Sequence, residues 1–180
     1  MSFWPPQIMD CFQSVKLDLE SDFTPAAYNK LLHTLFPVDT PYTVYPQVHR
    51  HADSVTPSAR TTFTVYYKHV PVFLLDLHSY PTLTRISGRE AADDHIRMHM
   101  RDLLPYCPLA TLNAVSAFGT RLCFYSINTG GGIAPIRPTV DVDENHDPTP
   151  IDWWDYDLLD FDGASRLEGV VKKIRNVCAS

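Results

Sequence analysis

The sequence predicts an α/β fold: a single domain, residues 1–180, in which helices flank a central mixed sheet of about five strands. Of the 180 residues, 44% are hydrophobic and 12% are aromatic, which is enough to fill one core. Some segments repeat their apolar residues with the period of a helix, and others with the period of a strand. The two periods follow one another in the order α, β, β, β, α, β, β, α, without an internal repeat.

The first helix is predicted to run from Thr24 to Phe36. Thr24 supplies a capping hydroxyl, and Pro25 stands at the first helical position, where no N–H donor is needed. Apolar residues then follow at the i, i+3, i+4, i+7, i+8 spacing of one helix face, and Pro37 ends the run. Residues 1–23 are expected to form an N-terminal arm.

A β-hairpin is predicted next, after a strand at Tyr42–His49 in which Pro46 indicates the edge of a sheet. Residues 61–67 (TTFTVYY) alternate, and residues 70–77 (VPVFLLDL) are almost continuously apolar. Only two residues separate these runs, which is the length of a tight hairpin turn. We therefore expect antiparallel neighbours, the second of them buried on both faces.

The second half of the chain is predicted to hold a helix, two strands and a closing helix. The helical period returns at residues 87–104, and two short apolar runs follow at 112–118 and 122–127. Residues 128–162 are expected to be an acidic, proline-rich surface connection, because nine acidic residues and no Lys or Arg fall within its last 22 positions. Residues 163–180 are predicted to form a C-terminal helix.

Composition and charge exclude several classes of protein. The net charge is −6, and Lys and Arg are not concentrated as they are in most nucleic-acid-binding proteins. The charge by itself therefore neither favours nor excludes nucleic-acid binding. No run of 18 apolar residues occurs and residues 1–13 do not resemble a secretory signal, so we expect no membrane contact and a cytoplasmic or nuclear location. The four cysteines form no CxxC pair and are expected to be buried thiols.

Asp76 is the residue that says most about chemistry, because it lies near the end of an otherwise apolar strand. A buried carboxylate has to be paired, hydrogen-bonded or bound to a cation. His78 follows two positions later and therefore lies on the same face of the sheet. Asp-x-His at the end of a hairpin arm, with a helix after it, is the arrangement in which PD-(D/E)xK nucleases present their acidic and basic pair. Alternatively, the strand stops at Asp76 and the carboxylate caps the turn at Ser79–Pro81.

Four stretches of sequence carry a resemblance to known proteins: PVFLLDLHSYPTL, SGREAADDHIRMHMRDLLPYCPLATLNAVSAFGTRLCFYS, DWWDYDLL and LEGVVKKI. They are similar to a group of fungal, mostly mushroom-type, intracellular proteins of unassigned function whose core resembles PD-(D/E)xK nucleases. The resemblance runs from about Thr24 to Cys178. It implies a nuclease-like α-β-β-β-α-β core over residues 24–127, which agrees with the element order obtained from the residues themselves.

The nuclease motif is altered in this sequence. The resemblance places the first metal-binding carboxylate near Thr62, the second at Asp76 and the lysine at His78. One carboxylate with waters holds Mg²⁺ weakly, and histidine lacks the permanent positive charge of lysine. Asp53 is the candidate that could rebuild a metal site together with Asp76.

The resemblance also implies that polar residues of the helix at 87–104 face the active-site side. Arg85, Arg89 and Arg97 are therefore candidates for phosphate binding, and the alternative is that they are exposed surface arginines. We expect a catalytically degenerate module, without a cofactor, that binds a protein or a nucleic-acid partner. The alternative is a nuclease that depends on Mg²⁺ or Mn²⁺ and uses Asp76 and His78.

A second metal-binding pattern lies in the same helix. His95-x-x-x-His99 places two imidazoles one turn apart, which is a spacing that chelates Zn²⁺, and Asp94 is a neighbouring third candidate. The interpretation we favour from the sequence is a solvated polar helix face that also carries Asp93 and Arg97.

The acidic connection also matches part of a calcium-binding loop. Residues 141–147 offer carboxylates at the first ligand positions, but His146 stands where the sharp turn needs Gly, and prolines follow. We therefore predict a mostly irregular acidic segment that does not bind calcium tightly, with the aromatic residues Trp153, Trp154 and Tyr156 packed back onto the domain.

Overall fold

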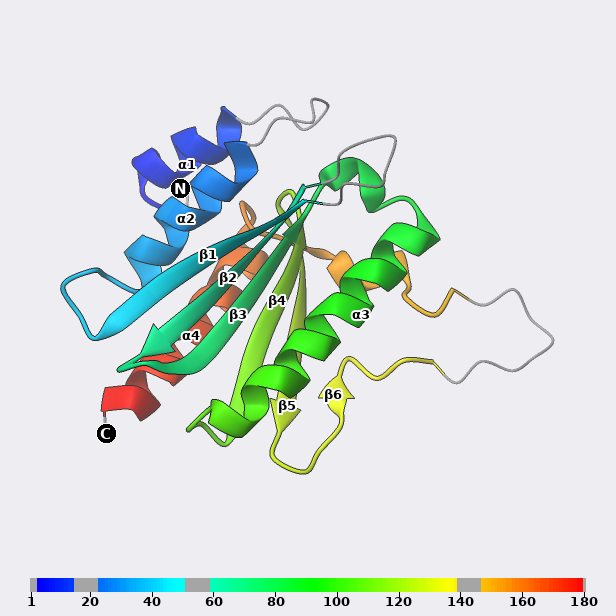
Figure 1. Ribbon diagram of the computed structural model, residues 1–180. Helices are drawn as coiled ribbons and strands as arrows, with labels where there is room; N and C mark the ends of the chain where they lie inside the picture. The colour runs from blue at the N-terminus through cyan, green and yellow to red at the C-terminus, as the bar shows by residue number, and fades with distance from the viewer. Residues whose placement is uncertain (1–2, 15–22, 51–58, 139–146, 180) are drawn as a thin grey trace.

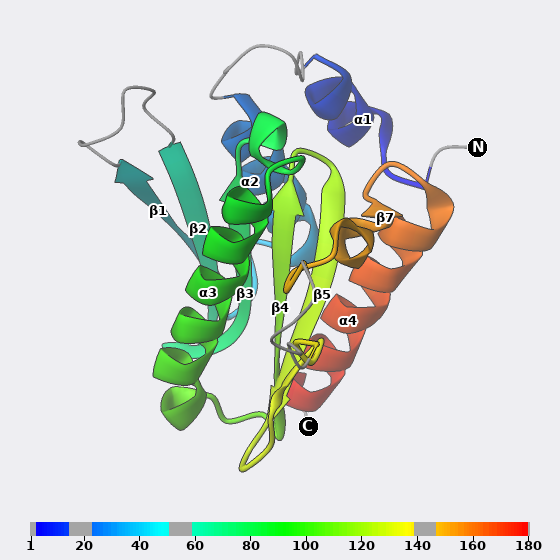
Figure 2. The same ribbon diagram turned by 90° about the vertical axis from the view of Figure 1, so that its right-hand side faces the viewer.

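The computed structural model describes residues 3–14, 23–50, 59–138 and 147–179. Over these residues, one mixed open sheet lies between helices, as Figures 1 and 2 show. The helices are α1 (Pro6–Gln13), α2 (Phe23–Leu35), α3 (Ile86–Leu103) and α4 (Phe161–Ala179). The strands are β1 (Tyr42–Arg50), β2 (Ala59–Tyr67), β3 (Val70–His78), β4 (Thr111–Phe118), β5 (Arg121–Asn128), β6 (Ile133–Ala134) and β7 (Tyr156–Asp157). The α/β class is confirmed. The described residues form seven strands where about five were predicted, and β6 and β7 were not predicted because they have only two residues each.

The strands lie in the order β1-β2-β3-β4-β5-β6, and β7 pairs with β5 beside this path. Neighbours are antiparallel except for β3 and β4, which are parallel. A parallel pair needs a long crossover connection, and α3 provides it. The crossover holds α3 across one face of the sheet, where it packs on β3 and β4 (Figure 1).

The predicted hairpin is confirmed. β2 and β3 pair in antiparallel register, with Thr62 opposite Asp76. The turn residues Lys68 and His69 have φ angles of 46° and 73°, the left-handed values that the twist of a two-residue hairpin requires. β3 is buried along nearly its whole length, as expected for a strand covered on both faces, and β1 lies at the edge that Pro46 indicated.

Helices cover the two faces of the sheet unequally. α1, α2 and α4 pack on one face, and α3 packs on the other together with Trp154 (Figure 2). The N-terminal arm contains a helix that was not predicted, α1, which inserts Ile8 and Phe12 into the core. Proline at the first helical position and this short apolar face explain why a helix forms there.

α3 buries a wider face than its apolar residues alone would define. Ala92, Ile96 and Met100 form an i, i+4, i+8 stripe against the sheet. Ala91 and Met98, two other apolar residues of this helix, lie outside the stripe and are exposed. Polar side chains on either side of the stripe complete the buried face, and they define the candidate site.

The acidic connection is more ordered, over the residues described, than its composition predicts. It contains a 3-10 helix at Ile151–Trp154, and Trp154 is completely buried, with its Nε1 donating to Ser116 Oγ at 3.3 Å. The prediction that this aromatic cluster packs onto the domain is therefore confirmed for Trp154. Most of the calcium-like stretch, residues 141–146, lies outside the described residues.

Two expectations drawn from composition can be compared with the structure. Within the described residues, no helix is both long enough and apolar enough to cross a membrane. Cys123 is buried as expected, but Cys11, Cys107 and Cys178 are only half-buried, and all four thiols are free.

Candidate functional site

Asp76 lies inside β3 at the centre of the sheet and is completely buried. The Thr62 hydroxyl on β2 donates to Asp76 Oδ1 at 2.7 Å. This bond follows from the register, because Thr62 and Asp76 are directly opposite one another on the hairpin. The alternative in which the strand stops at Asp76 and its carboxylate caps the next turn is wrong.

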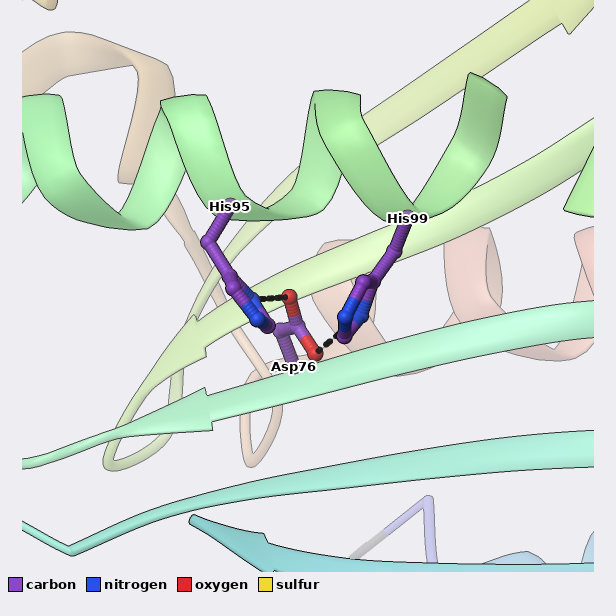
Figure 3. A group of neighbouring side chains, drawn as sticks. All are labelled: Asp76, His95 and His99. Carbon is purple, nitrogen blue, oxygen red and sulfur yellow. Dashed lines mark hydrogen bonds and ion pairs between the residues drawn. The ribbon is translucent and has the colours of Figure 1, made fainter. Parts of the chain in front are cut away.

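Two histidines of α3 point down onto this carboxylate (Figure 3). His95 Nδ1 lies 2.6 Å from Asp76 Oδ2, and His99 Nδ1 lies 4.0 Å from Asp76 Oδ1. The centroids of the two imidazole rings are 3.9 Å apart. The His95 side chain is 7% exposed and that of His99 is 20% exposed, so His99 is the more solvent-exposed of the two imidazoles.

The favoured expectation of a solvated helix face is therefore wrong for much of α3. His95, Asp93 and Arg97 are all buried. Asp94, the third metal ligand considered from sequence, is 68% exposed and pairs with Arg137. The structure places Asp76 beside the two imidazoles instead, from a strand that is 19 positions away in sequence from His95.

Further basic side chains surround the group, which we call the His–Asp cluster and define as Asp76, His95 and His99. The ring of His49 on β1 lies 5.8 Å from that of His95 and 6.1 Å from that of His99. His78 packs its ring against Phe118 at 5.1 Å. Its Nε2 is buried and has no hydrogen-bond partner among the described residues.

The electrostatics around Asp76 favour a charged carboxylate beside an uncharged His78 ring. Burial by itself opposes ionisation of Asp76, but the hydrogen bond from His95, the nearby His78 and the Thr62 hydroxyl hold its pKa below the usual value. Burial lowers the pKa of His78 to about 4, although Asp76 partly opposes this change. Burial also lowers the pKa of His99. Asp76 is thus ionised near neutral pH, and His78 carries no charge there.

These residues do not fit the Mg²⁺ or Mn²⁺ centre that the nuclease resemblance implies. Mg²⁺ is held by carboxylates and waters in octahedral geometry, and imidazole is not its preferred ligand. Thr62 stands where the first carboxylate is needed, and it uses its hydroxyl to bond to Asp76. Among the described residues, Asp76 is the only carboxylate of the cluster. Asp53, the predicted replacement ligand, lies outside the described residues.

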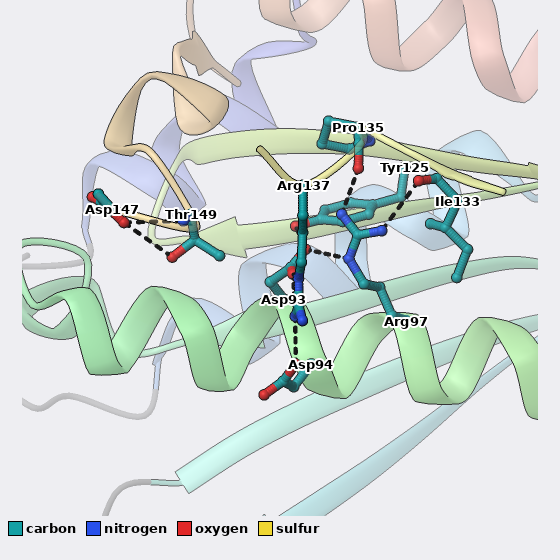
Figure 4. Close-up of polar contacts among 9 residues, drawn as sticks. All are labelled: Asp93, Asp94, Arg97, Tyr125, Ile133, Pro135, Arg137, Asp147 and Thr149. Atoms are coloured by element: carbon teal, nitrogen blue, oxygen red, sulfur yellow. Dashed lines mark hydrogen bonds and ion pairs between the residues drawn. The ribbon is translucent and has the colours of Figure 1, made fainter. Parts of the chain in front are cut away.

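The arginines predicted to bind phosphate have different surroundings. Arg89 is buried, donates to the carbonyls of Thr149 at 2.7 Å and Leu83 at 2.8 Å, and pairs with Asp147. Arg97 donates to Asp93 at 2.7 Å and to the carbonyls of Ile133 and Pro135 (Figure 4). Arg85 is exposed beside the start of α3. Phosphate binding by these three residues stays a prediction, and two of the three guanidinium groups are already engaged within the fold.

Sequence reasoning missed a second buried carboxylate, Asp93. It accepts hydrogen bonds from Tyr125 at 2.9 Å, Arg97 at 2.7 Å and Arg137 at 2.6 Å (Figure 4). These bonds tie α3 to β5 and to the segment after β6. A signal for this was present in the sequence. Asp93 and Arg97 have the i, i+4 spacing and lie on one side of the Ala92–Ile96 stripe. His95 and His99 have the same spacing and lie on its other side.

Fold and site together define an α/β module with a buried His–Asp cluster between a central strand and its crossover helix. Comparison of the chain with protein-family models, with curated proteins and with solved structures gave no significant match. The chemistry of the site therefore has to be argued from its own residues.

Proposed function

We propose that this chain is a nuclease-like α/β module that acts by binding a partner and does not cleave phosphodiester bonds. One observation carries the proposal: Asp76, at the position of the catalytic carboxylate, has both oxygens engaged inside the fold. Oδ1 accepts from Thr62 and Oδ2 contacts His95, while α3 covers the group. Asp76 is completely buried, so its carboxylate is not presented to a phosphate at the protein surface.

The position of the catalytic lysine supports the same proposal. Phosphoryl-transfer catalysis depends on positioning and on stabilisation of negative charge. His78 packs against Phe118 and offers no permanent positive charge to a phosphate. Loss of one oriented stabilising group costs about 10²- to 10³-fold in rate, so the combined loss of a carboxylate and a lysine removes most turnover.

A protein partner is favoured over nucleic acid. Arg89 and Arg97 are neutralised by internal carboxylates and carbonyls, so they do not contribute to a basic surface. Along α3 and the turn after it, Ile86, Met98 and Tyr106 are 50%, 49% and 70% exposed. Aromatic residues and methionine are enriched where proteins bind one another, so these exposed side chains are the candidate contacts for a protein partner.

The test is a cleavage and binding assay on the purified chain. Wild type, Asp76→Ala and His78→Ala are incubated at matched concentration with plasmid DNA and single-stranded RNA, with Mg²⁺ or Mn²⁺. Fluorescence anisotropy with labelled DNA and RNA is measured in parallel. We expect no cleavage by wild type above the Asp76→Ala level, and no saturable nucleic-acid binding at physiological salt.

Metal-dependent cleavage that both substitutions abolish would overturn the proposal and establish the nuclease alternative. Saturable binding to DNA or RNA without cleavage would replace the protein partner by a nucleic acid. Support for the protein partner requires three results with the same candidate protein. The wild-type chain retains it, the Tyr106→Asp variant does not, and the purified wild-type chain binds the purified candidate.

A further inference from the structure

The His–Asp cluster combines two imidazoles and one carboxylate that all face one point. Its three potential ligand atoms lie within 4.8 Å of one another. Two of the ligands come from one face of α3, where an i, i+4 spacing holds them one turn apart, and the third comes from β3 (Figure 3). Ligands fixed on a helix and a buried strand are held more precisely than ligands on loops.

The distances are close to those of a tetrahedral metal site. Bonds of 2.0–2.1 Å at tetrahedral angles place the ligand atoms about 3.3 Å apart. In the structure, His95 Nδ1 lies 2.6 Å from Asp76 Oδ2 and His99 Nδ1 lies 4.0 Å from Asp76 Oδ1, and these two distances lie on either side of that value. Shifts of less than about 1 Å in each side chain, well within rotamer adjustment, would bring the atoms to bonding positions.

We propose that Asp76, His95 and His99 form a binding site for a divalent transition-metal ion of the Zn²⁺ type. The ion replaces the proton between His95 and Asp76 and adds His99 as its third ligand. A fourth position remains for water on the His99 side, where the cluster is partly open to solvent. The bound ion would fasten α3 to the central strand. This inference does not depend on the proposed partner binding.

The donor set also selects the ion. Imidazole nitrogens suit Zn²⁺, Cu²⁺, Ni²⁺ and Fe²⁺, whereas Mg²⁺ and Ca²⁺ require oxygen ligands. The Thr62 hydroxyl donates to the same carboxylate and fixes its orientation. Such support is typical of metal sites, in which ligating carboxylates are themselves hydrogen-bonded.

The experiment is isothermal titration of the metal-free chain with ZnCl₂, and separately with MgCl₂. The test variant is His99→Asn, since His99 is the most exposed member of the cluster and its removal leaves the His95–Asp76 contact in place. The matched control is His69→Asn, an exposed turn histidine at φ 73°, a conformation that Asn tolerates. Circular dichroism verifies that both variants are folded, and Co²⁺ absorption reports tetrahedral coordination.

We expect one Zn²⁺ per chain with a Kd below about 10 μM, and no heat from Mg²⁺. Loss of a direct ligand should weaken Zn²⁺ binding by more than about 100-fold, since loss of a mere outer-shell partner costs about 10- to 100-fold. His69→Asn should bind as wild type does. Zn²⁺ at about 100 times Kd should raise the Tm of wild type by roughly 5–10 °C. Absence of saturable Zn²⁺ binding by wild type, or equal binding by His99→Asn, would overturn the proposal.

Discussion

Thr62→Val exchanges the hydroxyl that bonds to Asp76 for a methyl group of nearly the same shape. Thr62 and Asp76 are 1% and 0% exposed, so water cannot replace the lost donor. A hydrogen bond to a charged group contributes about 1.5–3 kcal/mol, and we expect the free energy of unfolding to fall by that amount. In a chain of this size, each 1 kcal/mol lowers the Tm by about 2–4 °C, so the Tm should fall by roughly 3–12 °C.

Urea denaturation followed by circular dichroism measures this change. Thr64→Val is the matched control, because Thr64 lies two positions along the same strand, is also buried, and its hydroxyl makes no hydrogen bond to another described residue. We expect Thr64→Val to leave stability unchanged or to raise it slightly, because valine favours strands. Equal stabilities of the two variants would refute the argument that the Thr62–Asp76 bond supports a buried charge.

Two further predictions concern packing and thiol chemistry. Gly163→Ala should destabilise the chain by about 1–3 kcal/mol, because the added Cβ would collide with the Asp157 backbone oxygen. On the same helix, the Cβ of Gly169→Ala would meet nothing within 4 Å, and this substitution should stabilise the chain by about 0.5–1 kcal/mol. Thermal unfolding compares the two, and equal effects would contradict the steric reasoning. Burial raises the pKa of Cys123 to about 12, so at pH 8 only about one molecule in 10⁴ carries the reactive thiolate. Mass spectrometry after iodoacetamide treatment at pH 8 should find native Cys123 unmodified, with labelling that increases as the pH is raised; rapid labelling at pH 8 would be inconsistent with this environment.

The hairpin of β2 and β3 could be predicted because its determinants are local. Alternation in one arm, continuous apolarity in the other and a two-residue turn specify the antiparallel pairing. The register at Thr62 and Asp76 could not be predicted, because an irregularity between Val65 and Tyr66 shifts it by one residue from the register that the turn sets. The short strands β6 and β7 could not be predicted, since a two-residue strand carries no period. They form because β5 offers them an edge, and that edge exists only in the folded sheet.

The candidate site was predicted in part. Asp76 was recognised as a buried charge from its apolar neighbours, but its partners come from α3, and sequence spacing does not show which way a helix faces. Because histidine is polar, the sequence favours a solvent-exposed position for His95 and His99. These two histidines lie beside Ala92, Ile96 and Met100 and therefore belong to the buried face of the helix. Their burial can be predicted only after these three residues have been identified as the apolar stripe.

Pro46 has a consequence for how this chain associates with others. β1 is the outermost strand on its side of the sheet, and a nine-residue edge strand ordinarily offers a continuous row of backbone donors to a second chain. Proline has no N–H, so that row is interrupted in the middle of β1. Extension of the sheet by a strand from a partner or from another copy is therefore disfavoured at this edge. A contact with another chain at this edge would therefore depend on side chains more than on backbone hydrogen bonds.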